Sequence, residues 1–212
     1  MYTGIMVICL LIGYGCGLFP TGLIVGKVNG IDVRKHGSGN VGMTNAMRTI
    51  GFKAGVITFA GDAGKTIAAM LIAWLLFRGY ADMRVYMLAA ALGAVCGHNF
   101  PFFLKFKGGK GIACTAGVVM GFYPPFMIIS FGLFAVAALA TKYVSLGSLL
   151  LVSSFYVQLV ICGQLGVFDL DMNGKAALYI LGAVFVALAF LRHKDNIKRL
   201  VSGTENKFSL HK

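Results

Sequence analysis

The stretch IACTAGVVMGFYPPFMIISFGLFAVAALAT, residues 112–141, decides how this chain folds. It contains no charged residue and is too long for one ordinary membrane span of about 20 residues. Pro124 and Pro125 interrupt it, and a proline removes a helical hydrogen bond and clashes with the preceding turn. We therefore predict two helices, 112–123 and 125–141, with a single kinked helix as the alternative.

The rest of the chain has the same character. Of its 212 residues, 58% are hydrophobic and only 12% are charged, and the mean hydropathy is +0.82. A soluble domain has about 25% charged residues, so these values predict an integral membrane protein. Further apolar runs of helical length occupy 4–26, 54–77, 85–104, 145–166 and 174–191. We expect an all-α protein with seven transmembrane helices in a single domain, 1–212.

Basic residues divide unevenly between the ends of these runs. The first, third, fifth and last runs are followed by Lys27, Arg34, Lys35, Arg48, Lys53, Lys105, Lys107, Lys110, Lys142, Arg192, Lys194, Lys198, Arg199, Lys207 and Lys212. The opposite side has Arg78, Arg84 and Lys175, together with Asp82, Asp169 and Asp171. Because basic residues stay on the cytoplasmic side, this pattern predicts an outside N-terminus, a cytoplasmic C-terminus and seven spans. The net charge of +12 then indicates contact with an anionic membrane surface and not with nucleic acid.

Three polar segments fall on the predicted cytoplasmic side. The first, 37–48, reads GSGNVGMTNAMR and combines glycines with side chains that donate hydrogen bonds, without an acid. Backbone amides in glycine-rich turns and such side chains bind anionic oxygens, so this segment predicts a phosphate site. A flexible glycine loop is the structural alternative.

The second segment, 97–111, reads GHNFPFFLKFKGGKG, and the third spans 193–207. Lys110 lies among glycines just before an apolar helix, which favours anion binding. In the third segment, His193 and Asn196 have a spacing that places them on one helix face. Basic residues at span ends are also ordinary topology determinants, and interfacial aromatics are ordinary anchors. The second segment could cross the interface as a re-entrant loop, as could the first.

Asp62 and Lys65 lie inside an apolar run at spacing i, i+3. Ionised groups there are costly and pair with each other or line a polar cavity, so a structural ion pair and a supporting role beside the site both remain open. Gly61 to Thr66 end like a P-loop, but the position that needs the first glycine is Phe59 and no strand precedes it. No metal site is predicted, because the histidines are scattered and no carboxylate cluster exists.

The three segments together resemble the motifs of the bacterial acyl-phosphate:glycerol-3-phosphate acyltransferases, the PlsY family. The resemblance covers nearly the whole chain. Its residues are Gly37 to Asn40, Gly42, Thr44, Asn45 and Arg48; Gly97, His98, Phe100, Pro101 and Lys105 to Gly111; and His193, Asn196, Ile197, Arg199, Leu200, Gly203, Glu205 and Lys207. Cys114 departs from the threonine that is common in the family.

The resemblance implies a reaction at the cytoplasmic face of the bacterial plasma (inner) membrane. A fatty acyl group would move from acyl phosphate to the 1-hydroxyl of glycerol 3-phosphate, giving lysophosphatidic acid and phosphate, the first acylation of phospholipid synthesis. No cofactor is implied. The expected partners are the two substrates, the lipid bilayer and a separate soluble acyltransferase that makes acyl phosphate.

The candidate site residues follow from the segments and the resemblance. Those expected in catalysis are Ser38, Arg48, Lys110, His193 and Asn196, and those expected in substrate binding are Gly39, Asn40, Gly42, Thr44, Asn45, His98, Gly108, Gly109, Gly111, Arg199, Glu205 and Lys207. The general base stays open between His193 and a phosphate of the donor, with Asp195 and Glu205 as further candidates.

Two other classes of function fit parts of the sequence. A transporter for a phosphorylated metabolite would suit seven spans and basic loops, but it predicts polar residues along a path through several spans, which the chain lacks. A non-catalytic membrane scaffold would not need three donor-rich segments.

Overall fold

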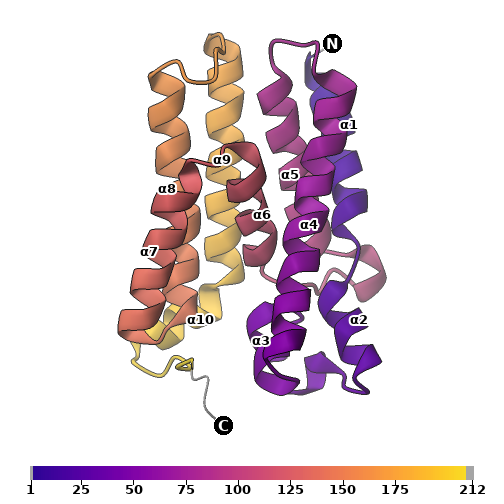
Figure 1. Ribbon diagram of the computed structural model, residues 1–212, viewed down its shortest axis with the longest axis vertical. Helices are drawn as coiled ribbons and strands as arrows, with labels where there is room; N and C mark the ends of the chain where they lie inside the picture. The colour runs from indigo at the N-terminus through magenta and orange to yellow at the C-terminus, as the bar shows by residue number, and fades with distance from the viewer. Residues whose placement is uncertain (1, 209–212) are drawn as a thin grey trace. The chain divides into compact units, whose positions relative to one another are not determined.

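The structure is a computed structural model that describes residues 2–208, and all regular elements within that range are helical (Figure 1). The chain divides into two compact units, Met1–Phe122 (unit 1) and Tyr123–Lys212 (unit 2). Lys212, which belongs to the basic pattern of the sequence, lies outside the described residues.

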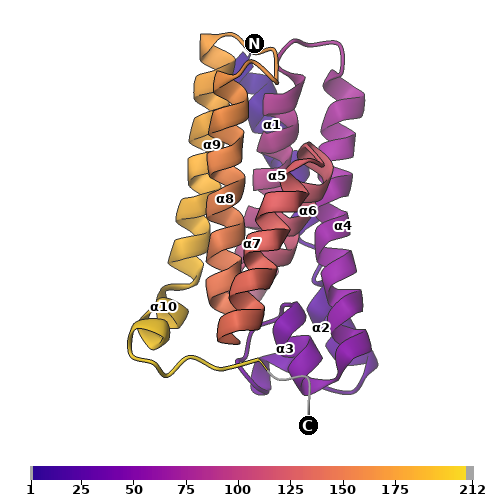
Figure 2. The ribbon, with the colours of Figure 1, turned by 60° about the vertical axis from the view of Figure 1, so that its left-hand side comes forward.

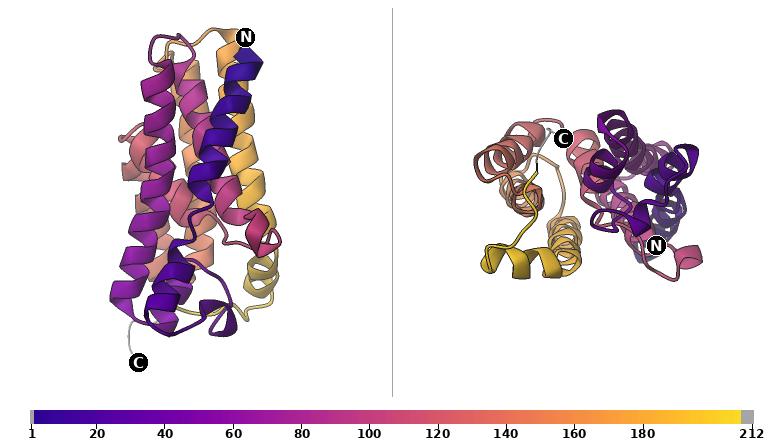
Figure 3. Two further views of the ribbon diagram at one scale, coloured as in Figure 1. Left: turned by 90° about the vertical axis from the view of Figure 1, so that its right-hand side faces the viewer. Right: turned by 90° about the horizontal axis from the view of Figure 1, so that it is seen from below.

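Unit 1 is built around one central helix. Its elements are α1 (Tyr2–Gly17), α2 (Thr21–Val28), η1 (Val33–Lys35), α3 (Met43–Thr49), α4 (Phe52–Phe77), α5 (Met83–Asn99), η2 (Phe102–Leu104) and α6 (Ile112–Phe122). Helix α5 packs against α1, α4 and α6, and α1 and α4 flank it (Figure 3). Gly13 and Gly93 allow α1 and α5 to approach closely, because a methyl group on either would collide with backbone of the other helix. Small residues serve this purpose in membrane helices, where apolar burial drives association less strongly.

The first predicted span, 4–26, is not one continuous helix. Helix α1 ends at Gly17, and α2 begins at Thr21 after Pro20. Proline has no N–H to continue the helical ladder, so the break has a local cause that the sequence already contained. The carbonyl of Phe19 at this break accepts a hydrogen bond of 2.8 Å from the ammonium of Lys65 on α4.

Unit 2 consists of α7 (Phe126–Thr141), α8 (Val144–Gln164), α9 (Met172–Arg192) and the short α10 (Lys194–Val201). Helix α8 packs on α7 and α9, and α10 turns away from the end of α9 (Figure 2). Phe126, Phe155 and Phe185 come one from each long helix, with neighbouring ring centroids 6.0 Å apart. Their edge-to-face contacts form the aromatic part of the core of this unit.

Within residues 2–208, five helical stretches are long and apolar enough to cross a membrane: Tyr2–Val28, Phe52–Phe77, Met83–Leu104, Val144–Gln164 and Met172–Arg192. Helices α6 and α7 are separate, as Pro124 and Pro125 predict, and both are shorter. The 11 residues of α6 extend about 16 Å, against a hydrocarbon core of about 30 Å. The structure is therefore that of a multi-pass helical membrane protein.

Candidate active site

The first polar segment forms a loop of fixed shape that leads into α3. Its organiser is Asn45, which is buried. Asn45 Oδ1 accepts a hydrogen bond of 2.8 Å from the amide of Ser38, and the two hydrogens of Nδ2 are shared among the carbonyls of Val33, His36 and Asn40 at 2.9–3.1 Å. One side-chain amide thus joins four points of the loop, which favours a defined loop shape over a flexible glycine loop. Sequence reasoning predicted a donor-rich segment but not this internal use of Asn45.

Two glycines allow the tight path of this loop. Gly37 and Gly39 have φ values of 59° and 69°, in the left-handed region that side chains with Cβ disfavour. The side chain of Asn40 accepts from the amide of Gly42 at 2.9 Å, which closes the loop before α3 begins. Ser38 is exposed, and Arg48, half-buried on α3, makes no ion pair with any residue in the range 2–208. The hydroxyl and the guanidinium therefore remain suitable for a ligand.

The second segment folds back onto the end of α5. The amide of Gly109 donates to the carbonyl of His98 at 3.1 Å, and the amide of Gly108 donates to that of Asn99 at 3.0 Å. These amides are directed at α5, which differs from the expectation that they cradle an anion; here Gly108 and Gly109 shape the loop. Lys110 follows them, half-buried, and α6 begins at Ile112.

The first and second segments lie near each other within unit 1. A cavity of about 10 Å³ is lined by Val41 of the first segment, by His98 and Gly108 of the second, and by residues of the break between α1 and α2. That volume holds about one water molecule. The two loops are therefore adjacent and closely packed.

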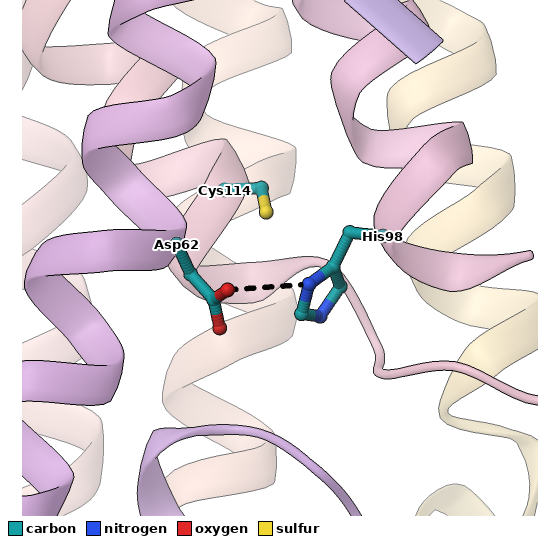
Figure 4. Close-up of side chains that lie close together, drawn as sticks. All are labelled: Asp62, His98 and Cys114. Atoms are coloured by element: carbon teal, nitrogen blue, oxygen red, sulfur yellow. Dashed lines mark ion pairs between the residues drawn. The ribbon is translucent and has the colours of Figure 1, made fainter. Parts of the chain in front are cut away.

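A buried polar cluster lies at the end of α5, where the second segment begins (Figure 4). Asp62, Lys65, His98 and Cys114 are all buried. Lys65 Nζ lies 2.8 Å from Asp62 Oδ1 and 2.9 Å from His98 Nδ1. The ion pair expected from the spacing is therefore present, and it is joined to the second segment. Sequence reasoning found the pair but missed its connection to His98 and Cys114, which come from other helices.

The same cluster has the composition of a metal site. One ligand-type atom from each of Asp62, His98 and Cys114 lies within 4.8 Å of the other two. The Lys65 ammonium lies at hydrogen-bond distance from two of these groups. The positive charge that a carboxylate needs in an apolar span is thus supplied by a side chain of the protein.

The third segment is centred on Glu205. Its Oε1 accepts from Ser145 Oγ at 3.0 Å and from Asn196 Nδ2 at 2.7 Å, and its Oε2 accepts from Arg199 Nε at 2.8 Å. Burial works to raise the pKa of this carboxyl, but the three hydrogen bonds outweigh it and hold the pKa below its usual range. Glu205 therefore ties the tail to α8 and α10, and a carboxylate so stabilised is a poor general base. Lys207 is exposed beyond it.

His193 is buried at the junction of α9 and α10. Its Nδ1 lies 2.7 Å from the carbonyl oxygen of Ala189. A carbonyl oxygen only accepts, so Nδ1 carries the hydrogen, and Nε2 is the basic nitrogen of the neutral ring. Asn196 is buried on the next turn and donates a hydrogen bond to Glu205.

Fold and site together define a class: an all-helical, multi-pass membrane protein whose polar, donor-rich loops adjoin the ends of its spans. The chain matches the glycerol-3-phosphate acyltransferase family over residues 7–203, and it belongs to that family. Glycerol-3-phosphate acyltransferases of Rubrobacter xylanophilus and Bacillus subtilis are 40% and 39% identical to it. The alignments cover 95% of this chain and 94% and 98% of those relatives.

Solved structures agree with this assignment. The crystal structure of PlsY (YgiH), an integral membrane glycerol 3-phosphate acyltransferase, in its glycerol 3-phosphate form is 32% identical, with a TM-score of 0.83 and 96% of each chain covered. The lysophosphatidic acid form of that protein gives a TM-score of 0.82, with 97% of this chain and 96% of that chain covered.

Proposed function

We propose that this chain, a membrane glycerol-3-phosphate acyltransferase by family, takes its fatty acyl group from acyl phosphate and transfers it to the 1-hydroxyl of glycerol 3-phosphate. The products are lysophosphatidic acid and phosphate. The observation that carries the proposal is the acid-free, donor-rich loop of Ser38 to Arg48 beside the loop of Lys110. A transporter function finds no such support, since the family and its solved relatives are acyltransferases.

The proposed roles divide among the three segments. The acyl-phosphate head is held by Ser38, Gly39, Asn40, Gly42 and Thr44, in a loop whose shape Asn45 sets. Arg48 and Lys110 bind phosphate, Arg48 through a planar group that can bind two oxygens at once. His98, Gly108, Gly109 and Gly111 shape the lysine loop. His193 and Asn196 orient glycerol 3-phosphate, with Arg199, Glu205 and Lys207 supporting the third segment.

The reaction depends mainly on the positioning of the two substrates. The oxygen of the glycerol hydroxyl attacks the acyl carbonyl carbon, and the bond from that carbon to the phosphate oxygen breaks with the electron pair leaving on phosphate. A mixed anhydride has a good leaving group, so the site needs to align two anions and stabilise the developing charge. Ser38, Arg48 and Lys110 supply the donors for this task, and no cofactor takes part.

The hydroxyl proton has two possible acceptors, His193 Nε2 and a phosphate oxygen of the donor. The hydrogen bond from His193 Nδ1 to Ala189 supports the first, because it leaves Nε2 basic. Turnover of purified His193→Gln separates them. A loss of about 10²-fold or more, the usual contribution of a general base, supports the histidine, whereas near-full turnover eliminates it.

The proposed setting is the bacterial plasma membrane, with seven crossings, the N-terminus outside and the catalytic loops on the cytoplasmic side, where they could dip into the interface. The distribution of basic residues supports this orientation. A soluble acyltransferase that forms acyl phosphate would supply the donor. We further propose that 1–212 acts as one domain, so that neither unit expressed alone has activity.

The decisive assay follows phosphate release by the purified protein from palmitoyl phosphate and glycerol 3-phosphate. We expect turnover with palmitoyl phosphate and none with palmitoyl-CoA. Arg48→Met and Lys110→Met should each lower kcat/KM by about 10²-fold or more, as loss of a charged contact to a phosphoryl group does. Lys107→Met, an exposed lysine of the same segment, is the matched control. Turnover with palmitoyl-CoA alone would overturn the choice of donor.

A further inference from the structure

Lys65 connects three separate parts of unit 1. Its ammonium donates to the Phe19 carbonyl at the α1–α2 break, to Asp62 on its own helix and to His98 at the end of α5, each at 2.8–2.9 Å. An ammonium has three hydrogens, so these contacts use all of them. The side chain is only 6% exposed. Because all three hydrogens of this buried ammonium have acceptors, the position of the Lys65 side chain is well defined.

The contact with His98 fixes the tautomer of that ring. An ammonium can only donate, so His98 Nδ1 must present its lone pair, and the ring hydrogen must then be on Nε2. Asp62 Oδ1 lies 3.4 Å from Nδ1, the pair that the dashed line in Figure 4 marks, and it would be the acceptor if the ring carried a hydrogen on Nδ1. A hydrogen on Nδ1 would point toward the ammonium at 2.9 Å, which is unfavourable. The other group facing the ring is the Cys114 thiol of α6.

The opposite edge of the ring contacts the glycine–lysine loop. A methyl group on Gly109 would collide with Nε2 of His98, so only glycine permits this approach. The carbonyl of His98 also holds the amide of Gly109. The ring and the backbone carbonyl of His98 therefore both contact Gly109, the residue that precedes Lys110.

We propose that Lys65 is a positioning residue for this enzyme: it holds His98 as the Nε2–H tautomer against Gly109 and thereby sets the geometry of the loop that carries Lys110. The inference rests on the proposed phosphate site at that loop. Lys65 itself touches no substrate in this scheme. Its effect reaches the reaction through His98 and Gly109.

The test compares Asp62→Asn with the double variant Asp62→Asn/Lys65→Met, because removing Lys65 alone would strand a buried carboxylate. Both variants lack the ion pair, and only the double variant lacks the donor to His98. The first readout is the pair of ¹⁵N chemical shifts of the His98 ring, assigned by comparison with His98→Gln. We expect Asp62→Asn to keep the Nε2–H signature and the double variant to lose it. An unchanged signature in the double variant, or a protonated Nδ1 in the native protein, would overturn the proposal.

The second readout is kinetic. Lys110→Met first identifies the phosphate substrate whose KM depends on the loop. For that substrate the double variant should have a KM about tenfold above that of Asp62→Asn, equal to about 1.4 kcal/mol, with a smaller change in kcat. If Lys110→Met changes neither KM nor kcat, the proposed phosphate site is wrong. If Lys110→Met does change them but the double variant matches Asp62→Asn, only the role of Lys65 is wrong.

A third comparison avoids the ion pair altogether. The amide nitrogen of glutamine can take the place of Nε2–H, whereas the shorter asparagine reaches only the position of Nδ1. His98→Gln should therefore keep more of the loop-dependent substrate affinity than His98→Asn. The reverse order would contradict the proposed tautomer.

Discussion

Two buried acids, one in each unit, are stabilised in different ways. Asp62 in unit 1 is 1% exposed; its Oδ1 accepts from the Lys65 ammonium at 2.8 Å and lies 3.4 Å from His98 Nδ1, and its Oδ2 has no hydrogen-bond partner among the described residues. Glu205 in unit 2 has both oxygens engaged by three donors from α8 and α10. The first acid is balanced by a single cation, and the second by a distributed set. The comparison predicts that two similarly buried acids differ in their sensitivity to the loss of one partner.

The largest effect is expected from Lys65→Met. It leaves the Asp62 carboxylate buried without a counter-charge, a change that costs about 3–5 kcal/mol when a buried pair is broken. We expect little folded, monodisperse protein in detergent, with recovery on adding Asp62→Asn. Lys53→Met, an exposed lysine on the same helix, is the control. Equal thermal stability of Lys65→Met and Lys53→Met would remove the contrast between the two acids.

Glu205→Gln should have the next largest effect. The glutamine NH₂ would face side chains that donate, so at least one of the bonds from Asn196 and Arg199 is lost. Hydrogen bonds to charged groups contribute about 1.5–3 kcal/mol, and we expect a loss of that order in the free energy of unfolding. Chemical unfolding of Glu205→Gln beside Asp195→Asn, an exposed acid on α10, measures it. A loss as large as that of Lys65→Met would mean that the three donors act as one unit.

The pH dependence of unit 2 offers a smaller, graded test. The folded-state pKa of Glu205 is lowered, so its contribution to stability is complete above the ordinary glutamate pKa of about 4.3. The contribution is lost as the pH falls through the lowered folded-state value. The difference in thermal midpoint between native protein and Glu205→Gln should therefore shrink below about pH 4. A difference that grows on acidification would contradict the assignment.

The smallest effect is expected at Asp32, an acid in the exposed loop of unit 1. Hydrogen bonds from the Arg34 side chain and backbone lower the pKa of Asp32 to about 2. Its contribution is present above the ordinary aspartate pKa and lost as the pH falls through about 2. Solvent screens such exposed pairs, so Asp32→Asn should leave the thermal midpoint at pH 7 unchanged within error. A shift approaching that of Glu205→Gln would show that burial is not what separates these sites.

Sequence reasoning succeeded where the signal is local. The break at Pro124–Pro125 and the helices on either side follow from proline chemistry alone. The break at Pro20 has the same cause, and it was missed because an apolar run of span length concealed it. The ion pair of Asp62 and Lys65 was visible because three residues separate neighbours on a helix face.

The site was predictable only in part, because many of its contacts join residues that are distant in the sequence. The composition of 37–48 predicts a phosphate-binding segment. The local sequence does not show that the side-chain amide of Asn45 forms its hydrogen bonds within the loop. His98 lies 33 positions from Lys65, and Glu205 lies 60 positions from Ser145. Such pairs depend on helix packing, which sequence spacing does not encode.

The sequence by itself determined that this chain is a helical membrane protein with donor-rich segments, and its motifs determined the family. Hydropathy, charge and motif spacing are properties of consecutive residues, so they can be read from the sequence alone. Only the tertiary structure decided which donors form hydrogen bonds within the protein. Asn45 donates within its own loop, and the amides of Gly108 and Gly109 donate to α5. Lys65 donates to Phe19, Asp62 and His98. A hydrogen bond requires atoms about 3 Å apart in a set orientation, and for partners on different helices only the packing of those helices brings them there.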